Sequence, residues 1–96
     1  MLNDYYQIKY ENTAFRVIDN EVIVINLKDS TFHALDPVAS YIWQELDGKK
    51  SLKTITKKIC AEFDVDQKTA ENDIIEFINS LSDEKLVFRS SKTLEE

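Results

Sequence analysis

Residues 29–48 of this chain, DSTFHALDPVASYIWQELDG, decide its fold. Thr31–Leu35 has the composition of a short strand, and it stops at the pair Asp36-Pro37. Asp36 suits a helix N-cap because its carboxylate can accept a backbone N–H of the first turn, and proline suits the first helical position. Gly48, the only glycine, stands where a left-handed residue would end the helix. The stretch therefore predicts a strand that leads directly into a helix.

Two further strands are expected before this stretch, joined by short turns. Ala14–Ile18 and Glu21–Leu27 are rich in β-branched residues, and residues 19–20 and 28–30 carry turn-forming side chains. Three closely spaced strands predict an antiparallel meander. Residues 5–10 leave two alternatives open, a short edge strand or a loosely packed segment.

Three amphipathic helices are expected after the meander. They run from Pro37 to about Leu46, from after the N-cap Ser51 to about Phe63, and from Gln67 to about Glu84. Their apolar residues recur at the i, i+3, i+4 spacing of a buried face. The sheet needs these helices to cover its apolar face, so we expect an α+β domain of the winged-helix type: a three-stranded antiparallel sheet followed by three helices.

Length and composition fit one domain. The chain has 96 residues with 43% hydrophobic content, which supports a packed core rather than disorder. We expect a single domain over residues 1–96, with a core over about 14–88 and loose ends at 1–10 and 89–96. No apolar run approaches the ~20 residues that span a bilayer, and the first residues are not typical of a signal peptide. We therefore expect a cytoplasmic protein without a membrane partner.

The charge of the chain opposes one class of partner. The net charge is −6, whereas non-specific nucleic-acid binding depends on Lys and Arg contacts with phosphates. Positive residues gather in 49–62 and negative residues in 64–84, the region of the third helix. We therefore expect no nucleic-acid partner.

Catalytic and metal-binding signals are weak. Cys60 is the only cysteine and falls on the apolar side of a helix, which favours a buried structural thiol. One cysteine and the single histidine, His33, do not make a usual zinc site, and no third group orients them as a nucleophile pair. We expect no catalytic residue, no metal and no cofactor, and hence no enzyme.

A binding surface is suggested by two features together. The apolar arc of the third helix is about 160° wide, which is broader than one packing face needs, so one edge of it can line a groove. Thr31–Leu35 is an edge strand if the meander keeps its chain order, and an extended peptide can pair with such an edge. The alternatives are that the N-terminal segment or a dimer partner covers this edge.

An ordered series of residues over about 14–88 resembles the PqqD-like family. The series includes the strand-to-helix junction Phe32…Leu35-Asp36-Pro37, the pair Ile42-Trp43, Leu46-Asp47-Gly48 and Ala70…Asp73-Ile74-Ile75…Phe77-Ile78…Leu81. The chain departs from the family at Ser30 and Lys85, which stand where glycine is common.

The resemblance implies a peptide chaperone, the stand-alone recognition element of ribosomal-peptide maturation. Such proteins bind the leader of a precursor peptide and present it to a radical SAM enzyme, a protease or a cyclase. The leader lies as an added strand in the groove between the third strand and the third helix. Carried over here, the peptide-binding residues are Thr31, Phe32, His33 and Ala34 for strand pairing and Asp73, Phe77 and Ser80 for the groove.

Two other functions remain open from the sequence. A winged-helix fold also suits a DNA-binding regulator, although the acidic third helix would repel phosphate. A structural subunit that binds a folded partner is the other alternative. A symmetric homodimer through the strand edge would compete with the peptide.

Overall fold

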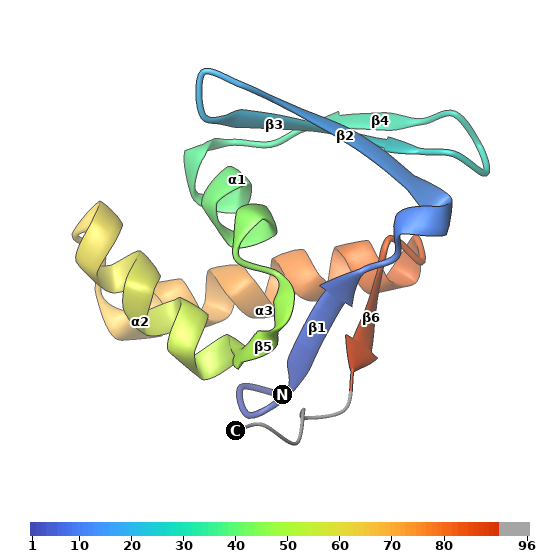
Figure 1. Cartoon of the computed structure of the whole chain (residues 1–96). Helices are drawn as coiled ribbons and strands as arrows, with labels where there is room; N and C mark the ends of the chain where they lie inside the picture. The colour runs from blue at the N-terminus through green and yellow to red at the C-terminus, as the bar shows by residue number, and fades with distance from the viewer. Residues whose placement is uncertain (91–96) are drawn as a thin grey trace.

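The computed structural model describes residues 1–90 of the chain. Its elements are β1 (Tyr5–Ile8), the 3-10 helix η1 (Tyr10–Asn12), β2 (Thr13–Ile18), β3 (Glu21–Asn26), β4 (Phe32–Ala34), α1 (Pro37–Gln44), β5 (Asp47–Ser51), α2 (Leu52–Phe63), α3 (Gln67–Asp83) and β6 (Val87–Ser90) (Figure 1). The expected α+β class is confirmed, and so are the three helices.

The strands form two sheets rather than one. The meander β2-β3-β4 is antiparallel as predicted, and a second antiparallel sheet has the order β5-β1-β6. The expectation of a loose N-terminus is wrong for residues 5–8, because β1 is the central strand of the second sheet. Residues 89–90 belong to β6 rather than to a loose end, and residues 91–96 lie outside the described residues.

The meander has one covered and one open face. In Figure 1 one face of the meander is turned toward α1 and α3. Val22, Val24 and Asn26 of β3 are buried and define this inner face. The cross-strand register places Phe15 and His33 beside Val24 on that same face. The intervening residues point outward, where the helices do not reach, and Phe32 is 69% exposed there.

The predicted capping residues start their helices. The Asp36 carboxylate accepts the Ala39 N–H at 2.8 Å, with Pro37 in the first turn of α1. The Ser51 hydroxyl accepts the Thr54 N–H at 3.2 Å at the start of α2. Each bond satisfies a backbone donor that the first helical turn leaves free.

Gly48 does not end α1, which stops at Gln44. The chain turns at once into β5, where residue Asp47 pairs with Gln7 of β1. Gly48 does adopt a left-handed conformation, with φ +75°, but it does so inside β5 and against the Gln7 side chain. The predicted backbone conformation was therefore right and its role was wrong.

Replacing Gly48 with alanine should destabilise the domain by roughly 1–3 kcal/mol. A Cβ at this position meets the Gln7 side chain, and a left-handed φ is strained for any residue with a Cβ. Urea unfolding of Gly48→Ala measures the loss. When Gly48→Ala is made in a Gln7→Ser variant, the loss of stability due to the collision with the Gln7 side chain should disappear, and the loss due to the strained φ should remain. An unchanged unfolding midpoint in the single variant would contradict this reading.

The hydrophobic core lies between the inner face of the meander, the three helices and the second sheet. Trp43 is fully buried in this core, and buried residues from every helix belong to the same cluster: Ile42, Leu52, Ile55, Ile59, Ala70, Ile74, Ile78 and Leu81. Cys60 packs against this core but is only partly buried, so its thiol is less enclosed than expected. Within residues 1–90, the helices are too short or too polar to cross a membrane.

Candidate peptide-binding site

A cavity of about 350 Å³ lies between α1 and α3, next to the end of β4. We call it the acidic groove; its lining residues are Asp36, Val38, Ala39, Ile42, Asp73, Glu76, Phe77 and Ser80. The structure thus brings together the three helix residues that the sequence predicted for a groove. Phe77 is partly buried and packs against the core, whereas Asp73 and Ser80 are exposed.

The rim of the acidic groove carries uncompensated negative charge. Asp36, Asp73 and Glu76 all line it, and none of the three is in an ion pair with another residue in 1–90. Beneath them, the base of the cavity is formed by Val38, Ile42 and Phe77. Such a surface favours a ligand with an apolar side chain and a nearby Lys or Arg.

Close to the acidic groove in the chain, β4 ends the meander and has one edge that is unpaired within residues 1–90. The Leu35 N–H donates to Val22 and the Thr31 carbonyl accepts from Asn26, so both residues face β3. Along an antiparallel strand the bonding direction alternates residue by residue. The N–H and C=O groups of His33 therefore also face β3, whereas those of Phe32 and Ala34 point away from the sheet.

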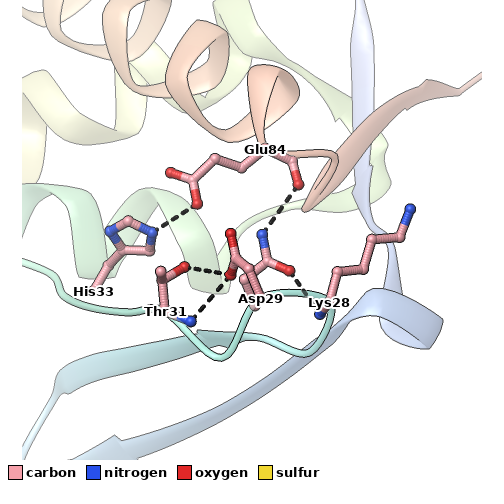
Figure 2. A network of polar contacts seen from close by, with 6 residues as sticks. Lys28, Asp29, Thr31, His33 and Glu84 are labelled. Carbon is pink, nitrogen blue, oxygen red and sulfur yellow. Dashed lines mark hydrogen bonds and ion pairs between the residues drawn. The ribbon is translucent and has the colours of Figure 1, made fainter.

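This alternation divides the predicted strand-pairing residues into two pairs. Phe32 and Ala34 offer free backbone groups to an added strand. Thr31 lies outside β4, and its N–H is bonded to the Asp29 carboxylate at 3.0 Å (Figure 2). Thr31 and His33 therefore shape the edge without offering the backbone pairing that the sequence analysis assigned to them.

The turn before β4 is fixed by Asp29. Its carboxylate accepts the Thr31 hydroxyl at 2.7 Å as well as the Thr31 N–H. The hydroxyl bond is the main reason why the pKa of Asp29 lies below its ordinary value, with the backbone bond adding to the effect. Ser30 completes the turn with a left-handed φ of 64°. These contacts hold the start of β4 in place.

A polar bridge connects the meander to the end of α3. His33 Nε2 lies 2.9 Å from Glu84 Oε1, and the Asn26 side-chain amide donates to the Glu84 carbonyl at 3.4 Å. Figure 2 shows the imidazole turned toward Glu84. The contact between Asn26 and Glu84 could not be predicted from the sequence, because 58 residues separate them. The bridge sets the spacing between the β4 edge and α3.

The acidic groove combines carboxylates, one hydroxyl and apolar side chains. Among residues 1–90, no group of three or more His, Cys, Asp or Glu side chains is arranged to hold a metal ion.

The fold and the site define a small α+β domain that combines an acidic groove between two helices with a strand edge that is unpaired within residues 1–90. A family model described as Coenzyme PQQ synthesis protein D (PqqD) matches residues 21–87. The chain belongs to the PqqD family, as the resemblance in its sequence implied.

Curated relatives cover part of the same region. The chain is 38% identical over 53 residues to a "PqqA binding protein" of Xanthomonas euvesicatoria pv. vesicatoria (strain 85-10), which is 55% of this chain and 58% of the relative. A "PqqA binding protein" of Xanthomonas campestris pv. campestris (strain B100) is 36% identical over the same length. The chain thus spans little more than half the length of these relatives.

A solved structure matches almost the whole fold. It is "TbiB1 in Complex with the TbiA(beta) Leader Peptide", with a TM-score of 0.77 and 32% sequence identity. The match covers 90% of this chain and 99% of the other.

Proposed function

We propose that this chain binds the leader segment of a ribosomally made precursor peptide and presents it to a modifying enzyme. The observation that carries the proposal is the free β4 edge beside the acidic groove, in a fold similar to one solved with a leader peptide. The enzyme is a radical SAM protein, a protease or a cyclase, the classes that the family serves. Binding takes place in the cytoplasm, where the ribosome releases the precursor.

The leader adds to the meander as a fourth strand. Its backbone pairs with the outward N–H and C=O groups of Phe32 and Ala34. Leader residues opposite these two share the outer face with them, and the residues in between point inward, toward α3. One apolar leader side chain then occupies the base of the acidic groove near Phe77, and a Lys or Arg meets its rim.

A direct titration tests this function. The labelled leader of the precursor encoded beside this chain is titrated with the purified protein, and fluorescence polarisation is recorded. We expect saturable binding in the micromolar range or tighter, and none with a scrambled leader of equal composition. Retention on the modifying enzyme without any leader binding would support the structural-subunit alternative. Salt-sensitive binding to random duplex DNA would support the regulator alternative.

Charge reversal on the rim should weaken leader binding. Asp73→Lys and Glu76→Lys are each expected to lower the affinity for a leader with a basic residue by about 10-fold, since each replaces an attraction by a repulsion. The polarisation titration measures both. Glu71→Lys is the matched control, because at 100° per residue it projects from the opposite side of α3. Equal affinity of all three variants and the original chain would contradict the role of the rim.

A further inference from the structure

Within residues 1–90, the meander has a second unpaired edge, on β2. Val22 and Asn26 bond toward β4, so by alternation Ile23 and Ile25 bond toward β2. The bond from the Leu27 N–H to the Asn12 carbonyl follows the same alternation. Ala14 and Arg16 therefore face β3 through the register of the ladder. The N–H and C=O groups of Phe15 and Val17 point away from the sheet, as those of Phe32 and Ala34 do at the other edge.

A cavity of about 290 Å³ lies under this edge. We call it the Trp43 cavity; its lining residues are Ile8, Tyr10, Phe15, Val17, Trp43, Gln44, Leu46 and Asp47. Aromatic rings form one side of it. Phe15 contacts Trp43 edge to face with ring centroids 5.3 Å apart, and Tyr10, 65% exposed, lies 6.4 Å from Phe15. An edge strand and a cavity thus occur together here, as they do at β4, but this cavity is lined mainly by apolar and aromatic side chains.

Trp43, one of the lining residues, carries a hydrogen-bond donor that is unsatisfied within residues 1–90. Its side chain is fully buried, and its indole N–H has no hydrogen-bond partner within residues 1–90. A buried donor without a partner costs about 1–3 kcal/mol. A bound peptide that brought a carbonyl within reach of this N–H would remove that cost.

Arg16 indicates the charge of the occupant. It is exposed on the outer face of β2, and it makes no ion pair with another residue in 1–90. Two copies of this chain paired through β2 around Arg16 would place the two arginines opposite each other, which is destabilising. A strand with Asp or Glu opposite Arg16 fits better, so the features favour a different partner over a second copy.

We propose that the β2 edge and the Trp43 cavity form a second strand-addition site, which takes an extended apolar segment with an acidic residue from the modifying enzyme. This inference rests on the proposed function, in which the leader and the enzyme bind together. The leader uses β4 and the enzyme uses β2, on opposite edges of one sheet. The peptide is thereby held beside the enzyme without either partner displacing the other.

Enzyme binding by two β2 variants tests the second site. Val17→Pro removes an outward N–H without touching the ladder to β3, and Arg16→Glu reverses the charge of an exposed side chain. Binding of the purified modifying enzyme encoded beside this chain is measured by biolayer interferometry at saturating leader. We expect both variants to lose at least 10-fold in enzyme affinity while their leader affinity stays unchanged. Lys53→Glu, an exposed change of the same sign on α2, is the matched control.

The outcomes separate this inference from the proposed function. Unchanged enzyme affinity in Arg16→Glu and Val17→Pro overturns the second site and leaves leader binding intact. Failure of the original chain to bind the leader, with enzyme affinity still sensitive to Arg16→Glu, overturns the proposed function alone. A dimer in sedimentation equilibrium that Val17→Pro dissociates overturns the enzyme as occupant and assigns the edge to a second copy.

Discussion

Ala34→Pro should lower leader affinity by about 10- to 100-fold while the domain stays folded. The Ala34 N–H points away from β3, so proline removes a hydrogen bond to the leader and places its ring in the path of the added strand. No hydrogen bond between β3 and β4 is lost. Edge strands tolerate proline where the N–H faces solvent. Fluorescence polarisation gives the affinity, and circular dichroism with a thermal melt confirms the fold.

Two variants control this experiment. Ala34→Val keeps the N–H and suits a strand, so its leader affinity should match that of the original chain. His33→Pro removes an N–H that faces β3, and we expect it to lower thermal stability together with binding. Full leader affinity in a folded Ala34→Pro variant would mean that the leader does not pair with β4 at this residue.

Trp43→Ala should cost about 3–5 kcal/mol of folding free energy, the usual loss for a buried large aromatic side chain. The side chain is fully buried in the core and contacts the Phe15 ring of β2 edge to face. Because a domain of this size has a stability of about 5–15 kcal/mol, the variant should unfold at much lower urea concentration.

Trp43→Phe separates the two roles of this side chain. Phenylalanine fills part of the volume and has no indole N–H that needs a partner, so its cost should be clearly smaller than that of Trp43→Ala. Urea unfolding followed by far-ultraviolet circular dichroism measures both variants. Equal stability of Trp43→Ala and the original chain would contradict a contribution of Trp43 to core packing.

Local signals made much of the fold predictable. The caps at Asp36 and Ser51 begin α1 and α2 where the sequence placed them, because a cap is a contact between residues three positions apart. Local signals of this kind could not predict the second sheet. Its strands come from residues 5–8, 47–51 and 87–90, and only the folded chain brings them together. Gly48 was misplaced because a left-handed glycine suits a strand irregularity as well as a helix end.

The residues that line the acidic groove could be predicted from the sequence, whereas the backbone geometry of β4 could not. Asp73 and Phe77 followed from the wide apolar arc of α3 and from the family resemblance, and they do line one cavity. Which backbone groups of residues 31–34 are free depends on the register with β3, which no local pattern specifies. The backbone conformation at Ser30 and Lys85 could be expected from the family resemblance, because glycine is common at both positions. Both residues adopt φ above +60°, a conformation that their side chains do not favour.

Amide hydrogen exchange of the chain, followed by NMR with and without saturating leader peptide, tests strand addition most directly. The account predicts that the Phe32 and Ala34 amides, which face away from the sheet, become protected when the leader binds. The His33 amide, which faces β3, and the Phe15 and Val17 amides on the other edge should change little. Saturable leader binding that leaves Phe32 and Ala34 exchanging as fast as in the free protein would contradict leader recognition through the β4 edge.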